Sequence, residues 1–365
     1  MNRSKAIINT KAIRHNLRII RETSGTKIIG IVKANAYGFG IEEISRILRE
    51  EKVEILGVPY VHEAQRLRKS GDNGEILITG SISIDQVDDI INNDLQVSIV
   101  NTKVLKALNQ EARKKETIIK IHIFIDTGMN REGVRTDELD LLIVELKTFT
   151  NLKVIGCLTH LISSDDEDKK QSQRQLSLFE EAKNKIENIF GKLDYTHTHN
   201  SAAIFSGIKN NATYSRPGLS IYGYLPNREL YNSSKLEMGL ELISEVTLVK
   251  KVIKGENIGY SNKFIADRDM EIALIPIGYG HGYSWEMFNK GTFEINGKAC
   301  IIVGSVCMDY TMVDISGLDV SEGDKVTIIG NSGIADNIYD VAEKVGTIPY
   351  VIITQLLPRI ERLYI

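Results

Sequence analysis

The chain has 365 residues, of which 42% are apolar, so it is too long for one small core and long enough for two domains of ordinary size. Its 45 lysines and arginines nearly balance its 48 aspartates and glutamates, which argues against a dedicated nucleic-acid-binding protein. It lacks a hydrophobic signal region after Met1, an apolar run of the roughly 18 residues that span a bilayer, and enough closely spaced cysteines for a disulfide framework or zinc cluster. We therefore expect a globular cytoplasmic protein with no nucleic-acid or membrane partner.

Short apolar runs alternate with helix-periodic segments through the first two thirds of the chain. Residues 27–32 predict a buried strand, and the apolar spacing over 41–48 predicts one face of the helix that follows. Seven more strand candidates follow, at residues 55–58, 76–78, 97–100, 118–125, 154–158, 195–196 and 212–214. Eight strands alternating with helices predict a closed (β/α)₈ TIM-type barrel. The competing architecture is an open doubly wound sheet, which usually has fewer strands and a glycine-rich first turn that residues 33–38 lack.

The pattern changes to a mostly β one after about residue 237. Strand candidates separated by glycine-containing turns lie at residues 245–252, 271–275, 300–303 and 325–329. One helix is expected, since Ile338, Val341, Ala342 and Val345 share a helical face. We therefore predict a barrel domain over residues 1–237 and a mostly β domain over residues 238–365.

Polar or charged residues follow five of the predicted barrel strands, namely Lys33 and the segments 126–131, 159–160, 199–201 and 216–218. In (β/α)₈ enzymes the functional groups project from these C-terminal strand ends. Desolvation in the barrel mouth would lower the pKa of Lys33 and suit its amine to Schiff-base formation with a carbonyl compound. From the pattern alone, a lysine reaching out to solvent is the more common outcome.

The other polar segments each have an ordinary structural explanation beside the functional one. Asn200 and Ser201 suit a helix N-cap as well as a phosphate site. His160 alone is more often structural than catalytic, and Arg131 and Arg216 suit a surface charge and a turn brace as well as ligand binding. The seven histidines are scattered without a close carboxylate–histidine pattern, so we predict no metal site. A functional role is favoured over these structural explanations because all the segments lie at the same edge of the predicted barrel.

Taken in chain order, the motifs resemble those of the bacterial alanine racemases, pyridoxal-phosphate enzymes of fold type III. The segment 32–38, Val-Lys-Ala-Asn-Ala-Tyr-Gly, resembles the cofactor-lysine segment of that family. The match continues through residues 126–129, 159–160, 199–202, 216–218, 259–261, 275–279, 306–309, 348–350 and 358–359. The resemblance covers nearly the whole chain. It implies a pyridoxal 5'-phosphate-dependent interconversion of L- and D-alanine that supplies D-alanine for peptidoglycan.

The resemblance also implies two catalytic bases and a homodimer. Lys33 would hold the cofactor and transfer a proton on one face of the substrate Cα, and Tyr260 of the partner subunit would act on the other face. Because Tyr260 must reach the partner's barrel, the implied functional unit is a head-to-tail dimer with two composite sites.

Binding roles follow from the same resemblance. The implied cofactor-binding residues are Lys33, Tyr37, His160, Asn200, Ser201, Arg216, Gly218, Leu219 and Tyr350. Among these, Arg216 would face the pyridine nitrogen. Arg131 and the backbone amide of Met308 would bind the substrate carboxylate, and Tyr279 would narrow the entry to small side chains.

Three positions depart from the family pattern. Phe124 stands where many members have a lysine whose carbamate orients the substrate-binding arginine, Phe39 where histidine is usual, and Tyr310 where glutamine is common. Since Phe124 carries no charge, either another neighbour holds Arg131 or the substrate binds more weakly. The alternatives are a racemase for serine or a broader range of amino acids, a decarboxylase, and a non-catalytic pyridoxal-phosphate carrier.

Overall fold

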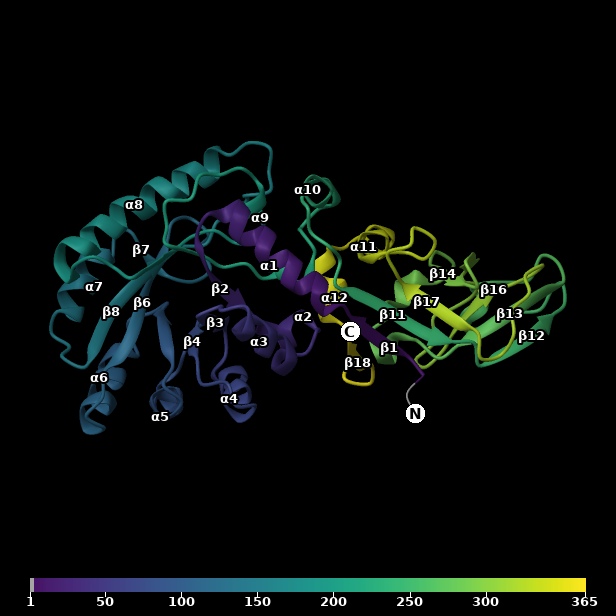
Figure 1. The fold of residues 1–365 in the computed structure, drawn as a ribbon, viewed down its shortest axis with the longest axis horizontal. Helices are drawn as coiled ribbons and strands as arrows, with labels where there is room; N and C mark the ends of the chain where they lie inside the picture. Colours follow the sequence, from purple (N-terminus) through teal and green to yellow (C-terminus); the bar gives the residue numbers. More distant parts are fainter. Residues whose placement is uncertain (1–2) are drawn as a thin grey trace.

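The computed structural model describes residues 3–365; Met1 and Asn2, the first residues of the predicted first domain, lie outside the described residues. A barrel and a mostly β part lie side by side along the long axis of the molecule, and the C-terminus lies near their junction (Figure 1). None of the helices within residues 3–365 combines the length and apolar character needed to cross a membrane.

Eight parallel strands form the barrel, in the order β2-β3-β4-β5-β6-β8-β9-β10. Their bounds are β2 Lys27–Ile31, β3 Ile55–Val58, β4 Glu75–Ile78, β5 Gln96–Ile99, β6 Ile119–Asp126, β8 Leu152–Leu158, β9 Tyr195–His197 and β10 Tyr214–Ser215. The sheet closes because β10 pairs with β2 and β5 pairs with β6, which excludes the open sheet. All eight predicted strands are present, and the predicted fold class is confirmed.

The barrel helices pack against the outside of these strands (Figure 1). They are α1 Thr10–Ser24, α3 Ile41–Glu50, α4 Val61–Lys69, α5 Val87–Asn92, α6 Leu105–Lys114, α7 Leu139–Leu146, α8 Lys170–Phe190 and α9 Ser201–Phe205, with the 3-10 helix η1 Ile84–Gln86. The short elements α2 Lys33–Tyr37 and η2 Leu219–Tyr222 follow the C-terminal ends of β2 and β10, and α10 Arg228–Ser233 pairs through Arg228 with Asp340 and Glu343 of the second part. In α3 the predicted face, which includes Ile44 and Ile47, is buried, while Arg46 is exposed. Every residue of β3 is buried, as expected for a strand covered on both sides.

The second part contains a six-stranded and a three-stranded sheet. The six-stranded sheet runs in the order β15 Lys298–Ile301, β14 Thr292–Ile295, β17 Lys325–Ile329, β11 Leu240–Glu245, β1 Lys5–Ile8 and β18 Glu361–Tyr364. The other runs in the order β12 Leu248–Val252, β13 Met270–Ile275 and β16 Thr311–Asp314. Its helices and turns are α11 Ile338–Val345, α12 Pro349–Thr354, η3 Tyr260–Asn262, η4 Tyr279–His281 and η5 Trp285–Met287. The short strand β7 Val134–Arg135 belongs to the barrel sheet, where it pairs with β6.

The first strand of the chain belongs to the sheet of the second part. β1 pairs with β11 in antiparallel and with β18 in parallel orientation, so a segment from before the barrel joins strands from after it. A division of the chain at residues 237 and 238 therefore leaves one strand of the six-stranded sheet in the first segment. The division itself stays a prediction.

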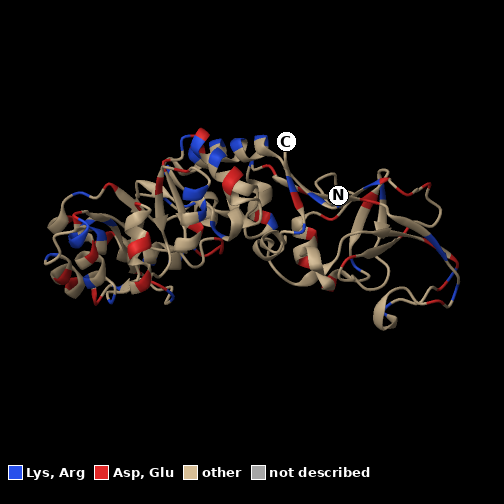
Figure 2. Ribbon diagram, turned by 90° about the horizontal axis from the view of Figure 1, so that it is seen from below, with Lys and Arg blue, Asp and Glu red and all other residues tan. Residues whose placement is uncertain are grey.

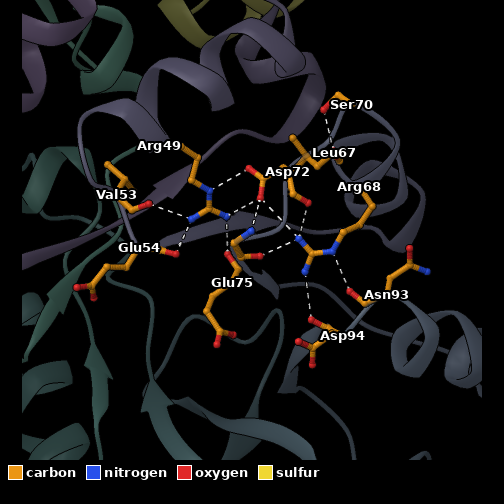
Figure 3. A network of polar contacts seen from close by, with 11 residues as sticks. Arg49, Val53, Glu54, Leu67, Arg68, Ser70, Asp72, Glu75, Asn93 and Asp94 are labelled. Carbon is orange, nitrogen blue, oxygen red and sulfur yellow. Dashed lines mark hydrogen bonds and ion pairs between the residues drawn. The ribbon is translucent and has the colours of Figure 1, made fainter.

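Charged residues of both signs are interspersed along the molecule, without a large region of one sign (Figure 2). One cluster of charges lies partly buried at the N-terminal end of the barrel strands (Figure 3). Arg49 binds the Asp72 carboxylate through two nitrogens, at 2.9 and 3.0 Å, and Arg68 donates to the carbonyl oxygens of Asp72 and Gly74. These contacts tie the loop before β4 to helices α3 and α4.

We expect Asp72→Asn to lower the free energy of unfolding by about 3 kcal/mol, because it leaves two partly buried guanidinium groups without their shared carboxylate. Urea unfolding followed by circular dichroism measures the change. Asp137→Asn, which removes an exposed partner of Arg135, serves as the control and should leave the midpoint unchanged. Equal unfolding curves for the two variants would contradict a stabilising role for the cluster.

Candidate active site

A cavity of about 950 Å³ opens at the C-terminal ends of the barrel strands. Ten of the thirteen predicted site residues line it: Lys33, Tyr37, Arg131, His160, Asn200, Ser201, Arg216, Gly218, Leu219 and Tyr350. The polar segments that follow different strands in the sequence thus meet in one place, as their shared strand-end position predicts.

Lys33 lies directly after β2, at the start of a left-handed turn. Four consecutive residues, Ala34 to Tyr37, have φ between 51° and 56°, and the amide of Gly38 donates to the carbonyl of Ala34. This conformation costs non-glycine residues roughly 1–2 kcal/mol each, so the surrounding structure must enforce it. One contact that does so is the Glu63 carboxylate, which accepts the Ala34 amide at 2.7 Å. The turn fixes the backbone at the position of Lys33.

The Lys33 side chain is exposed to the cavity, whose walls displace bulk water around its amine. This desolvation, followed by the positive charge of Arg131, lowers the pKa of the Lys33 amine below its ordinary value. Glu132 and Glu63 act in the opposite direction through their negative charges. A lowered pKa increases the fraction of neutral amine, which is the form that attacks a carbonyl carbon.

Hydroxyl groups gather at one end of the cavity, where Tyr37, Ser201 and Tyr350 meet the backbone of Gly218. The Ser201 hydroxyl accepts the Gly218 amide at 3.0 Å, and the Tyr37 and Tyr350 rings lie 6.3 Å apart. A Cβ at Gly218 would lie 2.4 Å from the Tyr37 hydroxyl, so only glycine permits this approach. Burial raises the pKa of Tyr37 and, to about 12, that of Tyr350. Both phenols therefore keep a proton to donate, which suits an anionic group.

Asn200 supports this end of the cavity from the start of helix α9. Its side-chain oxygen caps the helix by accepting the Ala203 amide at 3.0 Å, and its side-chain nitrogen donates to the Leu161 carbonyl. The N-cap expected from the sequence is therefore present, and Asn200 joins the loops after β8 and β9.

Arg216 is buried in the cavity wall beside His160. Its guanidinium donates to the carbonyl of Thr159 at 2.6 Å and to Nδ1 of His160 at 3.3 Å. Because arginine can only donate, Nδ1 of His160 carries no proton, and the neutral ring holds its proton on Nε2. Burial, followed by the charge of Arg216, lowers the pKa of His160 to about 3, which keeps the ring neutral at pH 7.

Arg131 lines the same cavity and pairs with the carboxylate of the next residue in the chain. Its Nε lies 3.4 Å from Oε2 of the neighbouring Glu132, which also lines the cavity. Phe124 is buried in the wall close to this loop, where a Cβ added at Gly133 would lie 3.0 Å from the Phe124 ring. Glu132 is thus a charged neighbour of Arg131 in a site where position 124 carries no charge.

Three predicted site residues, Tyr260, Tyr279 and Met308, lie on the second part of the chain and outside this cavity. Their side chains are 71%, 43% and 52% exposed. The segment 305–308, which includes Met308, joins them. Ser305 donates its hydroxyl to the Tyr260 carbonyl, and the Tyr279 amide donates to the Cys307 carbonyl. The second part therefore presents these side chains together on its surface.

Glu63 and Glu132 line the cavity but are not among the site residues predicted from the sequence. A glutamate in the first turn of a helix, as Glu63 is in α4, is an ordinary stabilising residue and gives no signal of its own. For Glu132 a signal existed, since it follows Arg131 directly in a loop that was already a candidate.

Comparison with known proteins identifies the family. Residues 8–226 match the family model for the alanine racemase N-terminal domain, and residues 239–364 match the model for the alanine racemase C-terminal domain. The chain belongs to the alanine racemase family. The family resemblance of the sequence is confirmed, and the chain is an enzyme, an isomerase of this family.

Other alanine racemases are similar to the chain over nearly their full length. Those of Clostridium novyi and Clostridium acetobutylicum are each 35% identical to it, over 99% of this chain and 95% of theirs. The solved alanine racemase of a D-cycloserine-producing Streptomyces lavendulae has a TM-score of 0.94 at 26% identity, over 100% of this chain and 97% of that one. The Bacillus anthracis alanine racemase with bound L-Ala-P has a TM-score of 0.92 at 30% identity, over 100% and 95% of the chains.

Proposed function

We propose that the chain interconverts L- and D-alanine with pyridoxal 5'-phosphate as cofactor and supplies D-alanine for peptidoglycan in the cytoplasm. The observation that carries the proposal is the cavity itself, where a lysine amine of lowered pKa, a group of hydroxyls and a buried arginine converge. The barrel, predicted over residues 1–237, would bind the cofactor.

The residues of the cavity fit pyridoxal phosphate. The hydroxyls of Tyr37, Ser201 and Tyr350, with the amides of Gly218 and Leu219, would hold the phosphate, and Asn200 would hold the loop that carries Ser201. Arg216 would donate to the pyridine nitrogen and keep it unprotonated, since a guanidinium only donates. His160 would lie against the ring. When bound, the cofactor withdraws electrons from the substrate Cα and makes its hydrogen acidic.

Racemisation requires proton transfer on both faces of Cα. Lys33 would serve one face, because its lowered pKa leaves a neutral amine able to accept a proton. Tyr260 of the partner subunit would serve the other. Nε2–H of His160 is then available as a donor that stabilises the phenolate, with Arg216 holding Nδ1 from behind.

A homodimer explains why Tyr260 is exposed in one chain. Large apolar side chains that face solvent in the second part include Tyr260, Tyr279, Trp285, Met308 and Tyr310. Exposed apolar groups of this kind mark interaction surfaces in proteins. We infer that this surface covers the barrel mouth of a second copy, where Met308 would bind the substrate carboxylate and Tyr279 would limit the entry.

Glu132→Gln should raise KM for alanine about five-fold with kcat nearly retained, because the amide no longer provides the charge that orients Arg131. Steady-state kinetics in both directions measure the effect. Asp137→Asn, an exposed change on the other side of β7, is the matched control. If the two variants have equal KM values, Glu132 does not orient Arg131.

The experiment that tests the proposed function is a panel of L-amino acids incubated with the protein and pyridoxal phosphate, with products resolved by chiral chromatography. Rapid formation of D-alanine, without carbon dioxide release, supports the proposal. Faster conversion of serine or of several larger amino acids would show that alanine is not the preferred substrate. Carbon dioxide release would indicate a decarboxylase, and no conversion of any amino acid would indicate a non-catalytic carrier.

A further inference from the structure

Arg216 is a buried cation that forms no ion pair with a carboxylate of the described residues 3–365. Within residues 3–365, the hydrogen-bond partners of its guanidinium are the carbonyl oxygens of Thr159, His197 and Thr198 and the imidazole nitrogens of His160 and His197. Since burying a charge is costly unless polar groups compensate it, the partners behind this guanidinium matter for its state.

A chain of hydrogen bonds leads from Arg216 into the centre of the barrel. The guanidinium contacts Nδ1 of His197 at 3.1 Å, and Nε2 of His197 lies 2.9 Å from Nδ1 of His122. Nε2 of His122 in turn lies 2.8 Å from Oε1 of Gln96. These three side chains come from β9, β6 and β5 and are almost completely buried.

This chain of hydrogen bonds ends at a carboxylate near the opposite end of the barrel. The Gln96 amide donates to Oε2 of Glu75, and Lys120 donates to Oε1 of Glu75 at 2.7 Å. Gln96 and Glu75 are the first residues of β5 and β4, so they lie at the N-terminal ends of the barrel strands, and Thr79 at the C-terminal end of β4 lines the cavity. The Glu75 and Lys120 side chains are 37% and 40% exposed. The chain of hydrogen bonds therefore runs through the barrel interior, from the cavity to the partly exposed ion pair of Glu75 and Lys120.

The direction of every bond in the chain is fixed. Arginine can only donate, so Nδ1 of His197 must accept and its proton must be on Nε2. That proton is donated to Nδ1 of His122, which places the second ring's proton on Nε2, where it is donated to Gln96. Burial, followed by the charge of Arg216, lowers the pKa of His122 to about 3 and that of His197 well below its usual value, so both rings are neutral. Each bond thus donates away from the cation and toward the anion.

We propose that His122, Gln96 and Glu75 are positioning residues that act through His197 to hold Arg216 in one orientation at the cavity wall. Aligned hydrogen bonds polarise one another, so the bonds that lead to the Glu75 carboxylate make Nδ1 of His197 a stronger acceptor for the buried guanidinium. The consequence for catalysis rests on the proposed function, in which Arg216 donates to the pyridine nitrogen of the cofactor.

A purely structural role would give a different result. If these side chains only satisfy one another in the barrel core, breaking the chain at Gln96 changes stability but leaves the imidazole of His197 and the turnover of the enzyme as they are. Ser98→Ala is the matched control, because Ser98 is buried two residues further along β5 and donates to the Ile78 carbonyl at 2.9 Å without joining the chain.

The test uses full-length protein labelled with ¹⁵N in its histidines, measured by nuclear magnetic resonance before and after reconstitution with pyridoxal phosphate. In the unmodified protein, both His197 and His122 should carry their proton on Nε2. Gln96→Leu should shift the Nδ1 resonance of His197 and lower kcat about ten-fold with KM for alanine unchanged, the size of effect that outer partners of ligand-binding groups have. His122→Gln, which can accept on one side and donate on the other, should retain kcat within about three-fold.

A proton on Nδ1 of His197 in the unmodified protein would overturn the inference without any variant. Equal His197 resonances and equal kcat values for Gln96→Leu and Ser98→Ala would also overturn it. The tautomers are measured in cofactor-free protein, so they hold or fail independently of racemase activity. Absence of racemisation by the unmodified enzyme, by contrast, would count against the proposed function and leave the tautomer result standing.

Discussion

Lys33→Ala is expected to abolish racemisation, with a loss of at least about 10⁴-fold in kcat, and to abolish the visible absorption band of protein reconstituted with pyridoxal phosphate. The reason is that the amine has two proposed tasks, since it would hold the cofactor and transfer a proton on one face of Cα. Absorption spectroscopy and chiral chromatography measure the two losses separately. Borohydride reduction of the unmodified enzyme should leave the cofactor covalently attached to the peptide that contains Lys33.

Two further variants make the Lys33 result specific. Lys33→Arg keeps the positive charge but not the nucleophile, because a guanidinium stays protonated, so it should be as inactive as the alanine variant. Lys27→Ala changes an exposed lysine at the other end of the same strand and should retain activity. A visible band and racemisation that both persist in Lys33→Ala would show that another group holds the cofactor.

The barrel could be predicted from sequence because its strands are continuous apolar runs between amphipathic helices. β1 could not be assigned in this way. Its four residues are only alternately buried, and its partners are Leu240–Ile243 in β11 and Glu361–Tyr364 in β18, more than 230 residues further along the chain. Local periodicity identifies a strand but carries no information about partners so distant, and the loop-rich second part offers few long periodic segments.

Local sequence patterns are limited in the same way for the site residues. Position at a strand end predicts some of them, and only the family resemblance supplied the others. Lys33, His160 and Arg216 follow strands, and parallel strands bring their ends to one edge. Tyr260 begins a short turn in which Ser261 and Asn262 have positive φ, and its position depends on the contact of its carbonyl with Ser305. Spacing does not encode such a turn. The buried chain behind Arg216 is likewise invisible in sequence, since its members come from different strands.

Tyr260→Phe should lower kcat about 10³-fold in both directions, the typical contribution of one acid–base group, while the cofactor band persists. The change removes only the phenolic oxygen from an exposed ring, so the fold should be unaffected. In D₂O, exchange of the Cα hydrogen should continue for one enantiomer of alanine and stop for the other, because Lys33 still serves its own face. Unchanged racemisation in both directions would remove Tyr260 from the mechanism.

Mixing two inactive variants tests whether Tyr260 acts across the dimer. When Lys33→Ala and Tyr260→Phe subunits are unfolded together and refolded in equal amounts, half of the dimers are hybrids, and each hybrid has one site with both Lys33 and Tyr260 intact. Activity should therefore return to about a quarter of that of the unmodified enzyme. If Lys33 and Tyr260 of one chain formed the site within that chain, every site in the mixture would lack one base and no activity would return. Because both parents are inactive, the recovered activity reports only on sites that two chains share.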